Sequence, residues 1–205
     1  DRPVMLDVVA TMGAIAARTE RIRMASSVHI APYRHPLNSA HQFATVDVLS
    51  NGRLIVGVGS GWDPEEFAAV GASFEHRGAV TEECVRIYKL AWTEPWLSFQ
   101  GRFFQIENVS MEPKPVQRPH PPIVFGAVSE AGARRAGRVA DGLYPMFLDS
   151  HADPGRFDSI RDAALREADR LGRDMSGFRL YAFASGLVVD ASDPLARLGR
   201  RRTLT

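Results

Sequence analysis

The sequence has a single cysteine and no long apolar run. Cys84 has no partner for an intrachain disulfide, and its acidic neighbours Glu82 and Glu83 give it no cation that would lower its thiol pKa. We therefore interpret Cys84 as a core thiol. No apolar run approaches the roughly 20 residues of a spanning helix, and no basic-then-apolar leader opens the chain. These absences favour a reducing cytoplasm and exclude a membrane as an expected partner.

Several catalytic signatures are also missing. The six histidines are scattered, and none belongs to a helix motif of two histidines and a carboxylate, so no metal site is expected. There is no G-x-S-x-G elbow and no Walker loop, which leaves a serine hydrolase or a kinase without support. The net charge is +1, and no basic block precedes Arg200 to Arg202, so nucleic acid is not an expected partner.

What is present is the composition of one ordinary globular domain. Hydrophobic residues make up 45% and charged residues 24% of the 205 residues. This length is below the roughly 250 residues of a usual (β/α)₈ barrel but ample for one buried core. The first residue is Asp1, and a helical pattern begins at Pro3 with no strand before it. We therefore expect the N-terminus to be truncated.

Apolar periodicity alternates between helical and strand-like segments along the chain. Short apolar strands separated by helices predict parallel pairing, because each crossover helix covers a face of the sheet. A hairpin around Gly101 and a proline-rich stretch predict an insertion over residues 93–121. The predicted helices are 3–18, 36–49, 64–70, 80–92, 129–139 and 154–171, and the strands 22–28, 54–59, 123–125, 142–147 and 180–189.

The class is therefore α/β, but periodicity alone does not separate a closed barrel from an open doubly wound sheet. A series of short motifs, in order and at characteristic spacing, resembles the luciferase-like monooxygenase superfamily over roughly residues 3–147. Within that family, the first motif is similar to the F420-dependent (deazaflavin) oxidoreductases of actinobacteria. The motifs are Pro32-Tyr33-Arg34-His35-Pro36, residues 44–54, Gly57-Val58-Gly59-Ser60-Gly61-Trp62, Gly101-Arg102-Phe103, residues 112–117 and residues 121–126.

The resemblance implies a TIM-like (β/α)₈ barrel of the bacterial luciferase type. The five predicted strands would be its third to seventh, with the first two and the eighth missing. Family members use residues of the second strand beside the reactive ring, so the activity of this chain alone is an open question, and no catalytic residue is assigned.

Cofactor-side residues are expected where strands end, because parallel α/β folds bind ligands beyond the carboxyl ends of their strands. Glycines after the second predicted strand would admit a flat ring closely, or simply form a tight turn; their spacing does not fit the dinucleotide fingerprint. In the family, the first predicted strand ends behind the flavin-like ring at a strained backbone or bulge. The candidates from these two strands are Gly57, Gly59 and Gly61, and Ala25, Ser26 and Ser27.

A second cofactor element is expected at the strand-to-helix loop Gly126, Ala127 and Ser129. Backbone N–H groups and the positive end of the helix dipole would hold a cofactor phosphate there, as the resemblance implies. Ser129 is equally explained as a helix N-cap. The family's usual loop has two glycines and a serine, from which Ala127 and Val128 depart.

The candidate substrate-pocket residues are Trp62, His35, His76 and Arg77. Trp62 would form a wall of the pocket, and His35, His76 and Arg77 would contact an anionic substrate or the cofactor. Helix entry and surface solvation are the alternatives for His35. Sugar-phosphate dehydrogenases of the superfamily place an acid where this chain has Trp62, which argues against that activity and favours a helix-start role for Glu66.

The sequence therefore predicts a flavin-type oxidoreductase acting on an unidentified small organic molecule, with coenzyme F420 as the first candidate cofactor and FMN as the alternative. With FMN the scaffold would be a monooxygenase supplied by a separate flavin reductase. A non-catalytic fragment without cofactor is the rival from another class, and a nucleotide-binding open sheet is a weaker one. Exposed strand edges in an incomplete barrel predict a homodimer or higher oligomer.

Overall fold

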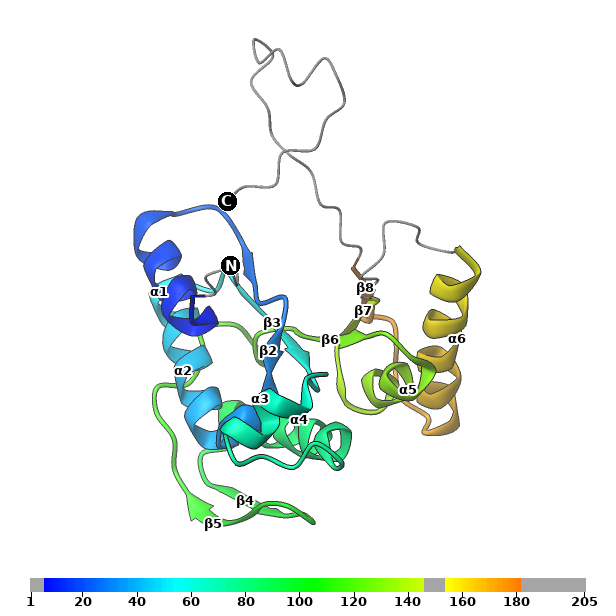
Figure 1. Ribbon diagram of the computed structural model, residues 1–205. Coiled ribbons are helices and arrows are strands. Elements are labelled where there is room, and N and C mark those ends of the chain that lie inside the picture. The colour runs from blue at the N-terminus through cyan, green and yellow to red at the C-terminus, as the bar shows by residue number, and fades with distance from the viewer. Residues whose placement is uncertain (1–5, 146–153, 182–205) are drawn as a thin grey trace, which may run out of the picture.

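The computed structural model describes residues 6–145 and 154–181. Its strands form one six-stranded parallel sheet and a separate two-stranded antiparallel hairpin. The helices lie in an arc around the strands, with α1 and α2 on one side, α4 below and α5 and α6 on the other (Figure 1). The elements are α1 (Val8–Arg18), β1 (Met24–Ala25), β2 (His29–Ile30), a 3₁₀ turn (Ala31–Tyr33), α2 (Pro36–Leu49), β3 (Leu54–Gly59), α3 (Pro64–Ala69), α4 (Arg77–Thr93), β4 (Leu97–Gln100), β5 (Gln105–Val109), β6 (Ile123–Ala127), α5 (Glu130–Val139), β7 (Gly142–Pro145), α6 (Pro154–Arg170) and β8 (Arg179–Leu180).

The order of the strands in the sheet decides between the two α/β architectures. The order is β1-β3-β6-β7-β8, with β2 also paired to β3, so every strand lies beside the next one along the chain. A doubly wound sheet reverses its order at a switch point, whereas a (β/α)₈ barrel keeps it sequential. The described strands therefore form an incomplete barrel, as the resemblance implied.

The predicted elements are largely confirmed, with two corrections near the N-terminus. The first helix begins at Val8 rather than Pro3, because the Asp7 carboxylate accepts hydrogen bonds from the N–H groups of Val9 and Ala10 at 3.0 and 2.9 Å and acts as its N-cap. The predicted strand 22–28 is split into β1 and β2. The predicted ends of the strands 142–147 and 180–189 extend beyond the described residues.

The split strand contains a β-bulge. Ala25 pairs with Ile55 and His29 with Val58, so four steps along the first strand oppose three along β3. The extra residue lies between Ala25 and His29. A bulge re-aims the side chains around it and interrupts the backbone ladder.

The two faces of the sheet differ in what covers them. Side chains alternate between faces along each strand, and residues paired in parallel register share a face. Leu54, Val56, Val58, Phe125 and Leu143 belong to one large buried cluster with the helices. This is the outer face. The opposite inner face carries only a small buried cluster of Ile55, Val124 and Tyr144, with Val28 and Tyr181 packed against it.

Ion pairs and buried hydrogen bonds tie the helices to one another and to the sheet. Arg138 of α5 pairs with Glu82 of α4 and Glu167 of α6, each at 2.9 Å. The indole N–H of Trp92 on α4 donates to the Ala40 carbonyl of α2 at 2.9 Å. Charge-assisted hydrogen bonds of this kind are shorter and stronger than neutral ones, so Arg138 joins three helices.

The hairpin of β4 and β5 confirms the prediction of a hairpin around Gly101, and lies away from the six-stranded sheet (Figure 1). Its turn is held by the buried carboxylate of Glu83 on α4, which accepts from the N–H groups of residues 102, 103 and 104 at 2.8, 3.0 and 3.2 Å. Whether residues 93–121 are an insertion into the barrel stays a prediction.

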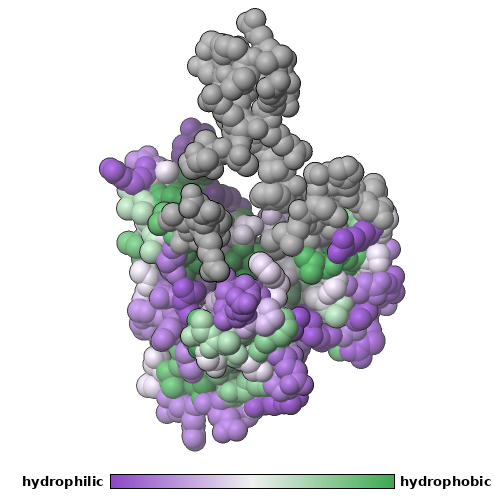
Figure 2. Space-filling model, in the orientation of Figure 1, coloured by the Kyte–Doolittle hydropathy of each residue, from purple (hydrophilic) through white to green (hydrophobic). Residues whose placement is uncertain are grey.

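Hydrophilic and hydrophobic residues are interspersed over the face seen in Figure 2. Among the described residues, no helix is both long and apolar enough to span a membrane. Cys84 is fully buried in the core, and burial raises the pKa of its thiol to about 12. The interpretation of Cys84 as a core thiol is confirmed.

Candidate functional site

The inner face of the sheet holds a cavity of about 230 Å³ at the bulge, which we call the inner-face cavity. Four of its lining residues are predicted cofactor-side residues: Ala25, Ser26, Ser27 and Gly57. Tyr144 comes from β7, two strands away from β3. The cavity thus lies where three neighbouring segments of the barrel face one another. Its full lining is Ala25, Ser26, Ser27, Ile55, Gly57, Val124, Tyr144 and Tyr181.

Ser26 fixes the backbone at the bulge. Its hydroxyl accepts from the N–H of Gly57 at 2.9 Å and donates to the carbonyl of Gly57 at 2.8 Å. Ser26 is 3% exposed, so these bonds are shielded from water. The serine side chain therefore supplies polar partners to β3 at the point where the bulge disrupts the backbone ladder.

Gly57 makes the close approach of the bulge possible. A Cβ atom at this position would lie 1.8 Å from the Ser26 carbonyl oxygen, a distance that no packed structure tolerates. Glycine is thus required first by the protein's own backbone, in addition to lining the cavity. The expectation that this glycine admits a flat ring remains a prediction.

The other two glycines of the run also accommodate protein atoms. A Cβ on Gly59 would lie 2.4 Å from the Val28 side chain, and one on Gly61 would lie 2.7 Å from the Phe67 ring. Gly61 has φ +76°, a conformation that favours glycine. Both positions are explained by local packing, and neither lines the inner-face cavity.

The bulge presents a polar pair to the cavity. The Ser27 hydroxyl donates to the phenol oxygen of Tyr144 at 3.3 Å, across 117 residues of sequence. Tyr144 is 9% exposed and packs in the small inner-face cluster with Ile55 and Val124. A hydroxyl pair in a mainly apolar cavity is a typical means of orienting one polar edge of a ligand. Sequence reasoning missed Tyr144 because its proximity to Ser27 depends on the order of the strands.

Three glycines lie along the middle rows of the inner face. The register pairs Gly57 with Val124, Val124 with Gly142, and Gly126 with Tyr144, so these residues share this face. A Cβ on Gly142 would lie 2.7 Å from the Arg179 carbonyl oxygen and 3.0 Å from the Tyr181 ring. Gly142, like Gly57, therefore accommodates the protein's own atoms.

The loop predicted to hold a cofactor phosphate contains a confirmed helix N-cap. The Ser129 hydroxyl accepts from the N–H of Gly132 at 3.3 Å. Ala127 lies at the end of β6 with its side chain in the outer-face cluster, whereas Gly126 pairs with Tyr144 on the inner face. A phosphate role for Gly126, Ala127 and Ser129 stays a prediction based on their backbone groups.

The predicted substrate-pocket residues do not line the inner-face cavity. Trp62 follows β3 and is 76% exposed. His35 is the N-cap of α2, and its ring contacts Phe104 edge-on at 5.7 Å between centroids. His76 precedes α4, with its ring centroid 5.4 Å from that of Phe103, and the Arg77 guanidinium lies 3.9 Å from the centre of the Phe74 ring. Their roles toward a substrate remain untested.

Glu66 has a tyrosine partner and lies at a helix start. The Tyr33 phenol donates to Glu66 Oε2 at 2.7 Å, and burial together with this carboxylate raises the pKa of Tyr33. Glu66 also lies in the first turn of α3, where an acid complements the helix dipole. This position agrees with the expected helix-start role.

Two buried polar groups lie outside the cavity. His29 is fully buried on the outer face, where its Nε2 lies 3.2 Å from the Ser39 hydroxyl; desolvation lowers its pKa to about 4. Asp47 accepts from the N–H groups of Val116 and Gln117 at 2.8 and 3.0 Å, which fixes the proline-rich segment. Asp47 therefore has a structural role.

No group of three or more histidine, cysteine, aspartate or glutamate side chains in the described part of the chain is arranged to hold a metal ion. The polar groups at the inner-face cavity are hydroxyls, which do not form a metal site on their own. The cavity thus offers hydrogen-bonding hydroxyls beside apolar side chains.

Comparison with known proteins gives consistent results. The family model described as luciferase-like monooxygenase matches residues 1–203. An FMNH(2)-dependent dimethylsulfone monooxygenase from Pseudomonas putida is 36% identical over 154 residues, which are 74% of this chain and 42% of that protein. An F420-dependent glucose-6-phosphate dehydrogenase from Amycolatopsis mediterranei is 34% identical over 139 residues, 66% of this chain and 41% of that protein.

Among solved structures, the monooxygenase RslO1 from Streptomyces bottropensis is similar with a TM-score of 0.73 and 30% identity. The similarity covers 85% of this chain and 53% of RslO1. The chain thus spans about half or less of the length of these three proteins. Relatives with F420 and relatives with FMNH(2) are both present, so the family resemblance does not choose between the two cofactors.

Proposed function

Because the chain belongs to the luciferase-like monooxygenase family, we propose that it binds a deazaflavin or flavin ring in the inner-face cavity and serves an oxidoreductase reaction on a small organic substrate. Coenzyme F420 is the first candidate and FMN the second. The observation that carries the proposal is the Ser26-fixed bulge opposite Gly57, which opens on a cavity of small residues and one hydroxyl pair.

The residues of the cavity fit a ring rather than a whole cofactor. Its volume of about 230 Å³ is below the roughly 300 Å³ at which pockets for complete drug-sized ligands begin. A planar ring would lie over Gly57 and Gly126, and a phosphate-bearing tail would extend toward the N-terminus of α5. The N–H groups there and the helix dipole favour an anion.

The protein's own contribution is binding and orientation. The bulge would press on one side of the ring, and Ser27 with Tyr144 would hydrogen-bond an edge of the ring or an oxygen of the substrate. When bound, F420 supplies hydride exchange, and FMN supplies oxygen chemistry once a separate flavin reductase has reduced it. The F420-dependent dehydrogenase among the relatives supports the first version, and the FMNH(2)-dependent monooxygenase supports the second.

Fluorescence titration of the chain with F420 and with FMN tests the proposal. We expect saturable binding of F420 that exceeds binding of FMN. Ala25→Leu fills the inner-face cavity and should abolish binding, whereas Ala10→Leu, on the exposed side of α1, is the matched control and should bind normally. Preferred binding of FMN would favour the monooxygenase version.

Failure of both cofactors to bind would reject the proposal for this chain and favour the third possibility, a non-catalytic fragment. If Ala25→Leu and Ala10→Leu bound the cofactor equally well, the cofactor site would lie outside the inner-face cavity. Analytical ultracentrifugation of the same samples would test the proposed homodimer or higher oligomer, for which the sheet edges at β1 and β8 are the candidate contacts.

A further inference from the structure

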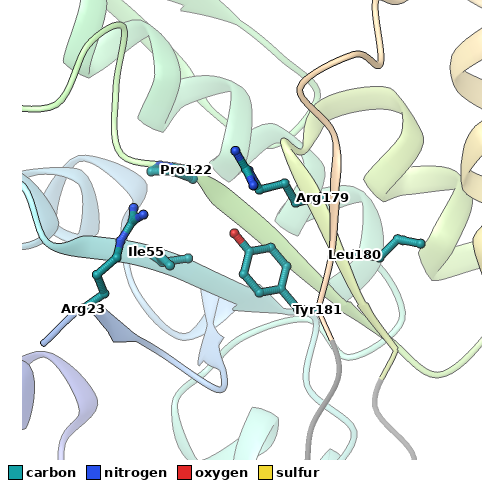
Figure 3. A pocket seen from close by; sticks show the side chains of 6 residues that line it. All are labelled: Arg23, Ile55, Pro122, Arg179, Leu180 and Tyr181. Atoms are coloured by element: carbon teal, nitrogen blue, oxygen red, sulfur yellow. The ribbon is translucent and has the colours of Figure 1, made fainter.

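A second and larger cavity lies at the opposite, amino-terminal end of the strands. Its volume is about 610 Å³, and we call it the amino-end cavity. Arg23 directly precedes β1, Pro122 precedes β6, and Arg179 begins β8. The inner-face cavity, in contrast, lies at the bulge. The lining residues are Arg23, Ile55, Pro122, Arg179, Leu180 and Tyr181 (Figure 3).

Two guanidinium groups from the two edges of the sheet line this one cavity. Arg23 belongs to the β1 edge and Arg179 to the β8 edge, and Figure 3 shows the Tyr181 ring between the strands that carry them. The pairing register places Arg179 beside Gly142, and a Cβ on Gly142 would lie 3.0 Å from the Tyr181 ring. The Tyr181 ring therefore lies against the sheet between the two arginine-bearing edges.

Neither arginine has a partner for its charge within the described ranges 6–145 and 154–181. No ion pair or side-chain hydrogen bond involves Arg23 or Arg179, whereas arginines elsewhere, such as Arg138, pair with carboxylates. The Tyr181 hydroxyl also has no hydrogen-bond partner among these residues. The lining thus offers three unused polar groups, two of them cationic, and no acidic side chain.

The acidic residue that precedes β7 already has an ion-pair partner and a hydrogen-bond donor. Asp141 precedes β7, and its carboxylate pairs with Lys89 at 2.5 Å and accepts from the Ile123 N–H at 2.8 Å. The Pro122 carbonyl is likewise engaged, by the Val56 N–H at 2.9 Å. Residues 6–145 and 154–181 therefore provide no counter-charge for the two guanidinium groups.

We propose that the amino-end cavity binds a phosphate-bearing small molecule, with Arg23 and Arg179 on the phosphate oxygens and the Tyr181 hydroxyl as an additional donor. A guanidinium presents paired N–H donors that match phosphate oxygens, so two of them on one cavity select a multiply charged oxyanion over a cation or an apolar ligand. The site is distinct from the expected cofactor-phosphate loop at Ser129, which lies at the other end of the sheet.

The two cavities share Ile55 and Tyr181 as lining residues. A ligand in the amino-end cavity would therefore contact the same tyrosine ring that borders the inner-face cavity. This shared wall allows a phosphate ligand to influence the proposed ring site through Tyr181. The proposed anion site does not depend on the oxidoreductase proposal.

Isothermal titration of the chain with inorganic pyrophosphate, without any flavin, tests the site. We expect saturable binding that persists against chloride at matched ionic strength. Arg23→Gln and Arg179→Gln should each weaken binding by roughly 10- to 100-fold, because each removes a charge-assisted contact. Tyr181→Phe should weaken it by roughly 3- to 10-fold. Arg21→Gln, an exposed arginine that does not line the cavity, is the matched control and should bind as the unmodified chain does.

Arg23 and Arg179 are exposed, and their side chains form no ion pair or hydrogen bond with residues 6–145 or 154–181, so thermal unfolding of their variants without ligand should match that of the unmodified chain. Absence of pyrophosphate binding, or equal weakening by Arg21→Gln and Arg23→Gln, would overturn the proposal. If the chain bound pyrophosphate but neither F420 nor FMN, the proposed anion site would stand, and only the proposed oxidoreductase function would be rejected.

Discussion

The two faces of the same sheet have different tasks. On the outer face, Leu54, Val58 and Phe125 are almost completely buried against the helices. On the inner face, Gly57 and hydroxyl-bearing residues line one cavity, and two arginines and Tyr181 line the other. Burial of large apolar side chains supplies most of the free energy of folding. The difference indicates that the outer face contributes most of the stability of the described part, whereas the inner face holds the cavities in which we propose that ligands bind.

The largest effect is expected on the outer face. Phe125→Ala removes a ring that is 1% exposed, and should lower the free energy of unfolding by about 3–5 kcal/mol. Urea denaturation followed by circular dichroism measures this change. Val124→Ala, one residue along and on the inner face, is the control and should cost clearly less. Equal losses would mean that the inner face also carries the core.

A pH effect should also arise on the outer face, from His29. Desolvation lowers its pKa to about 4 from 6.5, with a further contribution from Arg34 that Asp7 opposes. Below pH 6.5 the unfolded chain binds a proton that the folded chain does not. The stabilising contribution of neutral His29 is therefore complete above pH 6.5 and is lost as the pH falls toward 4. The free energy of unfolding should fall by about 3 kcal/mol in total over this range.

Denaturation midpoints measured between pH 7 and 4 check this dependence. His29→Gln keeps a polar group beside Ser39 but cannot take up a proton, so its stability should fall less steeply over the same range. Parallel pH profiles of the two proteins would show that the loss of stability comes from other groups. In that case the outer face would be less shielded from water than the burial of His29 indicates.

The alternation of helices and strands was predictable because it depends on local apolar periodicity. The strand at β3, the helix at α6 and the cap at Ser129 were all expected. The break between β1 and β2 was not predicted from the residues themselves, because a bulge is defined by pairing with another strand. The family resemblance, rather than the residue pattern, had indicated a bulge there.

The site was predictable only in part, for the same reason. Ala25, Ser26 and Ser27 were expected at a ring, and they do line a cavity. Tyr144 and the Glu83 clamp on the hairpin depend on segments that are far apart in the sequence. The close approach of the Ser26 carbonyl to Gly57 was also not predicted, because it depends on the backbone of a neighbouring segment.

An intermediate effect is expected from Gly57→Ala, which changes the inner face at the bulge. The added methyl would meet the Ser26 carbonyl, so the two strands must move apart, at a cost of about 1–3 kcal/mol. Binding of the ring should be lost together with the bulge geometry. Gly13→Ala, in α1 with no atom within 4 Å of the added Cβ, is the control and should not destabilise the chain. Unchanged stability and binding in Gly57→Ala would show that the bulge does not require this glycine.

The smallest effect on stability is expected from Tyr144→Phe, which separates the two tasks of the inner face most sharply. The change keeps the ring that packs on Ile55 and Val124 and removes the hydroxyl that accepts from Ser27. The free energy of unfolding should change by less than about 1 kcal/mol, while the affinity for F420 or FMN should fall by roughly 3- to 10-fold. Tyr33→Phe removes a phenol hydroxyl at Glu66, away from the cavity, and should leave cofactor affinity unchanged. If Tyr144→Phe lost stability but kept its affinity, the hydroxyl pair would belong to the fold, and the inner face would resemble the outer one at this position.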